Sequence, residues 1–121
     1  MARILVIDDE IFIRQLLTEI LENAGYEVVT APEGRTGLTL YEKNPFDVVI
    51  TDMVMPEYSG INTINDLVRK HPDAKIIAIS GGGEIEPERY LTIAEIIGAQ
   101  YIIYKPFKKE EILKAVEGLL S

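Results

Sequence analysis

The chain contains no cysteine among its 121 residues, so it can form neither a disulfide nor a zinc site built on thiolates. It also lacks any apolar run near the ~20 residues that a membrane-spanning helix requires. Its first apolar run is short and ends in acidic residues, unlike a secretory signal peptide. These absences predict a cytoplasmic domain without a membrane segment.

Basic residues are scarce as well. The chain has 12 Lys and Arg against 20 Asp and Glu, which gives a formal net charge of −8 at pH 7. Because this charge repels phosphate backbones and anionic lipids, we expect no direct binding to nucleic acid or to a membrane. The single histidine, His71, precedes Pro72 and is interpreted as a solvated loop residue.

What the chain does contain is enough apolar material for one core. Hydrophobic residues make up 47% of the sequence, which disfavours disorder. A domain of this length buries roughly two-thirds of the surface of its unfolded chain. No linker, repeat or low-complexity segment divides it, so residues 1–121 are predicted to form one domain.

Short apolar runs alternate with segments of helical periodicity. The strands are predicted at 3–7, 27–30, 47–51, 75–79 and 101–104, and the helices at 10–24, 33–43, 59–69, 87–97 and 109–120. Because most of these strands are almost continuously apolar, they are typical of a parallel sheet that is covered on both faces. The pattern predicts a doubly wound, three-layer α/β sandwich of the flavodoxin-like type, with strand order 2-1-3-4-5.

Polar residues follow four of the predicted strands. Asp8 and Asp9 follow the first strand, Asp52 the third, Ser80 the fourth and Lys105 the fifth. In a parallel sheet of this order, these positions meet at one edge, around the crevice between the first and third strands. Carboxylates gathered there repel one another, and a divalent cation with a preference for oxygen relieves that repulsion. We therefore expect a Mg²⁺ site, with Mn²⁺ as a possible substitute.

The same residues suggest a reaction at phosphorus. Asp52 stands alone after its strand and is the best nucleophile for forming an aspartyl phosphate. Lys105 would neutralise charge on the transferring oxygens, and Ser80 could hydrogen-bond one of them. Glu10 is expected to cap the following helix, with contact to the outer sphere of the metal as the alternative. Asp8, Asp9 and Glu10 by themselves could also be no more than an acidic helix start.

These motifs together resemble the receiver domain of two-component response regulators. The resemblance runs from residue 3 to about 120 and is carried by Ile7-Asp8-Asp9-Glu10, Thr51-Asp52-Met53-Val54-Met55-Pro56, Ser80 and Lys105-Pro106-Phe107. It implies that Asp52 accepts a phosphoryl group from a histidine kinase or a histidine phosphotransfer protein. It also implies that the backbone carbonyl of Val54 joins Asp8, Asp9 and Asp52 around Mg²⁺, and that a cis peptide bond precedes Pro106.

Two features of the chain depart from that family's pattern. The family's switching aromatic lies three residues before its lysine, where this chain has Ile102, and Tyr104 shares that side of the strand. Whether Tyr104 takes the aromatic's place stays open. The serine is followed by the glycines Gly81, Gly82 and Gly83, which are interpreted either as a flexible connector or as a mobile switch loop.

The surface for partners is predicted at the rim of the crevice and across the last strand. Ile11 and Phe12 lie outside the apolar face of the first helix. They form either an exposed contact patch or the cover of a loop. Pro106 and the fourth helix, fifth strand and fifth helix complete this surface. We expect a monomer, or a weak dimer that depends on phosphorylation, which contacts a downstream protein.

We expect a phosphorylation-controlled switch that is not itself an enzyme: phosphorylation of Asp52 shifts the surface formed by the fourth helix, the fifth strand and the fifth helix. Two other functions compete with this one. A phosphatase that forms an aspartyl phosphate would need a second acid two residues after the nucleophile, where this chain has Val54. A flavodoxin-like cofactor carrier would need a hydroxyl- and glycine-rich loop after the first strand, where this chain has Asp8 and Asp9.

Overall fold

The computed structural model describes residues 1–53, 60–81, 89, 92, 96 and 98–121. Its strands are β1 (Arg3–Ile7), β2 (Glu27–Ala31), β3 (Val48–Asp52), β4 (Ile76–Ser80) and β5 (Tyr101–Tyr104). Its helices are α1 (Ile11–Asn23), α2 (Gly34–Lys43), α3 (Gly60–Lys70) and α5 (Lys109–Leu120). The helix predicted at 87–97 lies outside the described residues, apart from isolated positions. The other predicted elements are confirmed to within one residue.

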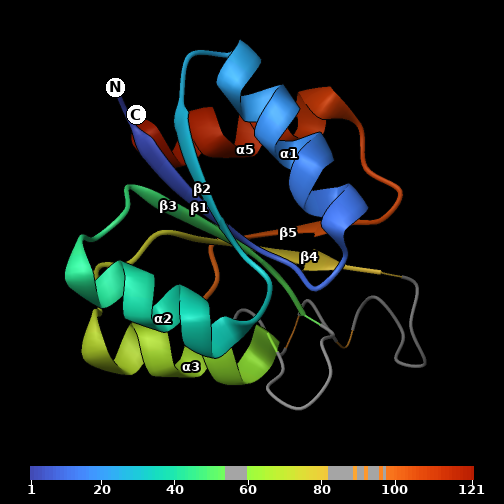
Figure 1. The fold of residues 1–121 in the computed structure, drawn as a ribbon. Coiled ribbons are helices and arrows are strands. Elements are labelled where there is room, and N and C mark those ends of the chain that lie inside the picture. The colour runs from blue at the N-terminus through green and yellow to red at the C-terminus, as the bar shows by residue number, and fades with distance from the viewer. Residues whose placement is uncertain (54–59, 82–88, 90–91, 93–95, 97) are drawn as a thin grey trace.

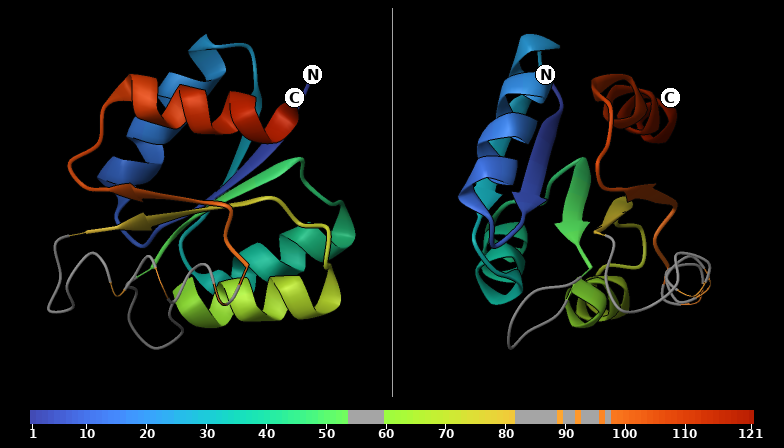
Figure 2. Two further views of the ribbon diagram at one scale, coloured as in Figure 1. Left: turned by 180° about the vertical axis from the view of Figure 1, so that it is seen from behind. Right: turned by 90° about the vertical axis from the view of Figure 1, so that its right-hand side faces the viewer.

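The strands form one parallel sheet in the order β2-β1-β3-β4-β5, as predicted. Helices α1 and α5 cover one face of the sheet, and α2 and α3 cover the other (Figures 1 and 2). Both termini lie at the same end of the sandwich (Figures 1 and 2). Among the described helices, none combines the length and the apolar character needed to cross a bilayer.

Period-two alternation along the strands feeds two apolar layers. In β1, Ile4 and Val6 face α1 and α5, whereas Leu5 and Ile7 face α2 and α3. All four side chains are at most 1% exposed. Burial of such a side chain is worth about 1.5–3 kcal/mol, so the strand that precedes Asp8 is stabilised by packing on both faces.

Helix α1 shows how closely periodicity anticipates packing. Its predicted apolar face is buried at Ile13, Leu17, Ile20 and Leu21, and Leu16 is half-buried. Ala24 continues the apolar spacing of this face but is exposed, because the helix ends at Asn23 and Ala24 is its C-cap residue. Gly25 follows with φ +95°, a left-handed conformation that favours glycine at this position.

His71 is not the solvated loop residue that its position before Pro72 indicated. Its ring lies 4.8 Å from the Tyr41 ring at 55°, and Nε2 is inaccessible to solvent. The backbone N–H of His71 donates to the carbonyl of Leu67, so the hydrogen-bond pattern of α3 continues one residue past Lys70, and the imidazole lies against Tyr41 of α2. The histidine therefore belongs to the packing between α2 and α3.

Candidate functional site

Two buried carboxylates lie side by side where β1 and β3 end. Asp8 directly follows β1 and is 1% exposed, and Asp52 is the last residue of β3 and is 4% exposed. They are neighbours because β1 pairs with β3 in a register that places Ile7 opposite Thr51. Asp9 lies beside them and is exposed. The structure thus brings together the acids that the sequence predicted at this edge.

The turn between β1 and α1 fixes the orientation of Asp8. One oxygen of its carboxylate, Oδ1, accepts a hydrogen bond from the backbone N–H of Glu10 at 2.9 Å. Arg14 Nη1 donates to the backbone carbonyl of Asp8 at 2.7 Å. This arrangement is an Asx turn, in which the Asp side chain accepts from the backbone N–H two residues later. The second oxygen, Oδ2, takes no part in the turn and interacts with Lys105.

Lys105 supplies the positive charge of the site. Its Nζ lies 3.3 Å from Asp8 Oδ2, 3.5 Å from Asp52 Oδ2 and 3.6 Å from Glu10 Oε1. The side chain is only 17% exposed. It follows the last residue of β5 and precedes Pro106 through the cis peptide bond that the resemblance implied. One ammonium therefore joins carboxylates from β3 and from the start of α1.

The pKa values of the site reflect this crowding. Burial raises the pKa of Asp8, and the hydrogen bond from Glu10 and the charge of Lys105 offset only part of that effect. Burial by itself would lower the pKa of Lys105, but Asp52 and Asp8 outweigh it, so the pKa of Lys105 is raised. The lysine is held charged, whereas ionised Asp8 remains incompletely compensated.

The donor set fits an oxygen-preferring cation. Carboxylate oxygens of Asp8, Asp9 and Glu10 all lie within 4.8 Å of one another. With Asp52, these carboxylates outnumber the one ammonium that the structure places among them. Excess negative charge on oxygen ligands is what Mg²⁺ binds. Val54, whose carbonyl the resemblance adds to this set, lies outside the described residues.

The Glu10 side chain does not cap α1, contrary to the prediction. It occupies the N-cap position of α1, but its side chain makes no capping hydrogen bond. The carboxylate extends toward Lys105 instead and is 59% exposed. A capping expectation rests on local sequence alone, and here an ion pair from the other end of the chain competes with it.

The chain around Ser80 reaches the site from the neighbouring strand. Ser80 is the last residue of β4, and its register partner on β5 is Tyr104. Gly81 is half-buried, and a Cβ placed there would meet Lys105 Cδ at 3.5 Å, an ordinary contact. Gly82 and Gly83 lie outside the described residues.

Gly60 also belongs to this region, although no motif of the sequence pointed to it. It begins α3, is buried, and donates its backbone N–H to the Met53 carbonyl at 3.2 Å. A Cβ at this position would overlap the carbonyl oxygen of Asp52 and lie 2.6 Å from its carbonyl carbon. The available signal was a glycine in the first turn of a predicted helix. Because glycine lowers helix stability, its presence there indicates that a larger side chain would not fit.

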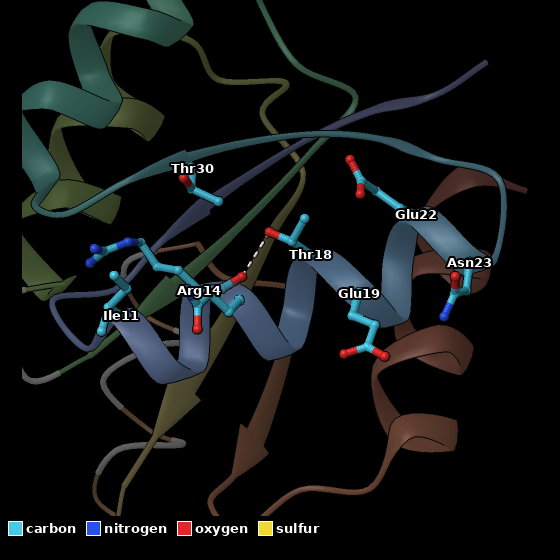
Figure 3. A pocket seen from close by; sticks show the side chains of 8 residues that line it. Ile11, Arg14, Thr18, Glu19, Glu22, Asn23 and Thr30 are labelled. Carbon is cyan, nitrogen blue, oxygen red and sulfur yellow. Dashed lines mark hydrogen bonds between the residues drawn. The ribbon is translucent and has the colours of Figure 1, made fainter.

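Ile11 and Phe12 are both exposed, at 62% and 67%, but they border different hollows. Phe12 lines an apolar groove of about 330 Å³ between α1 and the segment after β5, together with Ile13, Leu16, Lys105, Pro106 and Phe107. Ile11 lies at the end of a hollow of about 470 Å³ between α1 and β2 (Figure 3). Figure 3 shows mainly polar side chains along that second hollow, among them Arg14, Thr18 and Glu22. The predicted patch is therefore divided between two surfaces.

Comparison with known proteins bears on the whole chain. The family model described as the response regulator receiver domain matches residues 4–117. The chemotaxis protein CheY of Thermotoga maritima is 36% identical over 94% of this chain and 93% of its own length. The probable transcriptional regulator ycf27 of Cyanophora paradoxa is 36% identical over 98% of this chain, which spans 48% of that longer protein.

Solved structures agree with this match. A response regulator receiver domain protein from Clostridium thermocellum superposes with a TM-score of 0.91 at 34% identity, over 99% of this chain and 94% of its own. The response regulator TrrA from Thermotoga maritima, solved in complex with Mg²⁺-BeF, superposes with a TM-score of 0.86 at 35% identity, over 98% of this chain and 99% of its own. By sequence and by fold, this chain belongs to the receiver domains of two-component response regulators.

Proposed function

We propose that this domain is a signalling switch in which Asp52 accepts a phosphoryl group from a histidine kinase or a histidine phosphotransfer protein. The observation that carries the proposal is Lys105 Nζ, which lies 3.3 Å from Asp8 and 3.5 Å from Asp52 at the buried strand ends. An ammonium held between two carboxylates is already in place to stabilise negative charge that is added to either of them.

The proposed reaction is an in-line transfer. An Asp52 carboxylate oxygen attacks phosphorus, the bond from phosphorus to the donor's imidazole nitrogen breaks, and the departing imidazole regains a proton. Lys105 neutralises charge on the phosphoryl oxygens, and Ser80, at the end of the adjacent strand, offers a hydroxyl to one of them. The domain is then a phosphoacceptor that assists its own modification, rather than an enzyme that acts on others.

Asp8, Asp9 and Asp52 would hold Mg²⁺, with the Val54 carbonyl as a further ligand. The raised pKa of Asp8 supports this assignment, because a buried carboxylate with too little positive charge near it favours a cation. When bound, Mg²⁺ supplies charge neutralisation between the acceptor carboxylate and the transferring group. Mn²⁺ has the same preference for carboxylate ligands and should substitute.

Phosphorylation by a small-molecule donor tests this proposal. The chain is incubated with acetyl phosphate and Mg²⁺, and intact mass is measured for wild type and for Asp52→Ala. We expect a gain of one phosphoryl group that depends on Mg²⁺ and is absent from the variant. Steady turnover of a phosphomonoester would instead favour the phosphatase, and a bound yellow chromophore would favour the flavodoxin-like carrier.

We place Tyr104 on the output route of the switch. Tyr104 is the strand partner of Ser80 on β5, whereas Ile102 is the partner of Ala78 and packs against the core layer beneath α2 and α3. A movement of Ser80 toward a phosphoryl group would therefore be felt first at Tyr104. Tyr104 is 37% exposed, so a change at this position reaches the surface of the domain.

A Tyr104 label tests this route. With ¹³C-labelled tyrosine, phosphorylation should shift the Tyr104 ring signals more than those of Tyr101, which occupies the same strand. Tyr101 is a suitable internal control because its register partner is Ile77, at the far end of β4 from Ser80. Equal or absent shifts at both rings would contradict the route.

We further propose that the phosphodonor docks on the apolar groove that Phe12 borders. This groove includes Lys105 in its lining, so a protein seated there reaches the site directly. Phe12→Ala should slow phosphotransfer from a phosphorylated histidine phosphotransfer protein and leave phosphorylation by acetyl phosphate unchanged. Ile11→Ala is the matched control, since Ile11 is similarly exposed but lines the hollow between α1 and β2. An equal loss in both variants would refute this docking site.

A further inference from the structure

Glu10 has an unexpected orientation for an acidic residue at a helix start. Its backbone has φ −88° and ψ 117°, the extended conformation usual for an N-cap residue, but its carboxylate does not bond the first turn. Oε1 lies 3.6 Å from Lys105 Nζ instead. The Glu10 carboxylate therefore interacts with a cation from the other end of the chain and not with the helix that it precedes.

Lys105 is shared among carboxylates that differ in exposure. Asp8 and Asp52 are almost completely buried, whereas the Glu10 side chain is 59% exposed and stands at the rim. The two buried acids are also among the ligands that a divalent cation would need. An ammonium and a divalent cation repel each other strongly when they contact the same buried oxygens. Binding of the cation must therefore push Lys105 away from Asp8 and Asp52.

We propose that Glu10 is a positioning residue for Lys105, which holds the ammonium at the rim when a divalent cation occupies Asp8 and Asp52. The inference rests on the proposed function only in taking those two acids as cation ligands. Glu10 offers Lys105 a remaining carboxylate within reach, so it lowers the cost of displacing the lysine. It also keeps the ammonium close to the place where a phosphoryl group would arrive.

A direct effect of Glu10 on the cation and an effect through Lys105 predict different results when Lys105 is replaced. If Glu10 acted on the cation directly, as a ligand or as one more negative charge, its removal would weaken cation binding whether or not Lys105 were present. If Glu10 acts through Lys105, most of the effect disappears once Lys105 is replaced. A double-mutant cycle separates these two possibilities.

The cycle uses Mn²⁺ as the probe and requires no phosphorylation. Free Mn²⁺ is measured by electron paramagnetic resonance in titrations of wild type, Glu10→Gln, Lys105→Met and the double variant. Removal of an exposed ion-pair partner should weaken Mn²⁺ binding by about 2- to 5-fold. In the Lys105→Met background the same change should have less than half of that effect. Glu19→Gln, an exposed acid on the same helix, should leave binding unchanged in both backgrounds.

An equal fold-change for Glu10→Gln in both backgrounds would overturn the inference, and so would no change in either background or a wild type that binds no Mn²⁺. Far-UV circular dichroism checks that each variant folds, and Lys105→Gln replaces Lys105→Met if the latter does not. A wild type that binds Mn²⁺ but takes no phosphoryl group from acetyl phosphate would refute the proposed function without entering this cycle.

Discussion

Replacement of Gly60 by alanine is the sharpest test of how the end of β3, at Asp52, is held in place. The added methyl group would overlap the carbonyl oxygen of Asp52, and it would lie 2.6 Å from the carbonyl carbon and 2.7 Å from Met53 Cα. These are main-chain atoms at the end of a strand that is buried along its whole length, so no side chain can rotate away to make room. The backbone at Asp52 or the start of α3 has to move.

The magnitude follows from the kind of atoms that collide. Overpacking of a well-packed interior costs about 1–3 kcal/mol, and a collision with main-chain atoms belongs at the upper end of that range. A loss of about 3 kcal/mol should lower the midpoint of thermal unfolding by about 10 °C in a domain of this size. Because Asp52 itself is displaced, a misplacement of about 1 Å should also slow phosphorylation by about 100-fold.

Two other glycines provide matched controls for the alanine substitution. At Gly118 the new Cβ would meet the Tyr101 hydroxyl at 2.6 Å, but this is the end of a flexible side chain, and alanine favours the helix. At Gly25 nothing lies within 4 Å, so alanine there meets only the strain of φ +95°, a cost of about 1–2 kcal/mol. We expect the free energy of unfolding of Gly118→Ala to lie within about 1 kcal/mol of the wild-type value.

Urea denaturation and the rate of phosphorylation by acetyl phosphate are the two measurements. We expect Gly60→Ala to show the largest loss of stability in this series, together with a loss of phosphorylation that the other two variants do not share. If Gly60→Ala were as stable as Gly118→Ala, the close approach of α3 to the Asp52 carbonyl would be refuted.

Two further predictions concern charge and packing. In EDTA, Asp8→Asn should raise the free energy of unfolding near neutral pH, because burial raises the pKa of Asp8 and wild type therefore loses stability as pH rises through that raised value. The gain in stability of Asp8→Asn over wild type should vanish at pH values below the ordinary pKa of a carboxyl group. It should also shrink when Mg²⁺ is added. Urea melts that show no gain near neutral pH would contradict this. Leu17→Ala removes a side chain with 0% exposure and should cost about 2–5 kcal/mol in a urea melt, more than Leu16→Ala at the half-buried neighbour.

Much of the fold could be predicted because local spacing encodes it. Short, mainly apolar runs identified each strand that the structure describes to within one residue, and the strand order followed from right-handed crossovers in an alternating β/α pattern. The placement of Asp8, Asp52, Ser80 and Lys105 at one edge of the sheet then followed from that topology.

The failures of prediction share a cause. Glu10 was expected to cap α1 and reaches Lys105 instead, and the Asp8–Lys105 pair joins residues 97 positions apart. His71 was expected in solvent and packs against Tyr41 of α2. Gly60 gave no sign that it lies against the Asp52 carbonyl. Each of these outcomes depends on a partner that neighbouring residues do not reveal.

The sequence by itself determined the parallel sheet, its strand order and the set of acids and cation delivered to one edge, because periodicity and strand ends are local properties. Only the tertiary structure decided that Asp8 and Asp52 are buried while Asp9 and Glu10 stay exposed, and that Lys105 lies among them. Those features set the pKa values of Asp8 and Lys105, because desolvation and Coulomb energy depend on distances in space rather than along the chain.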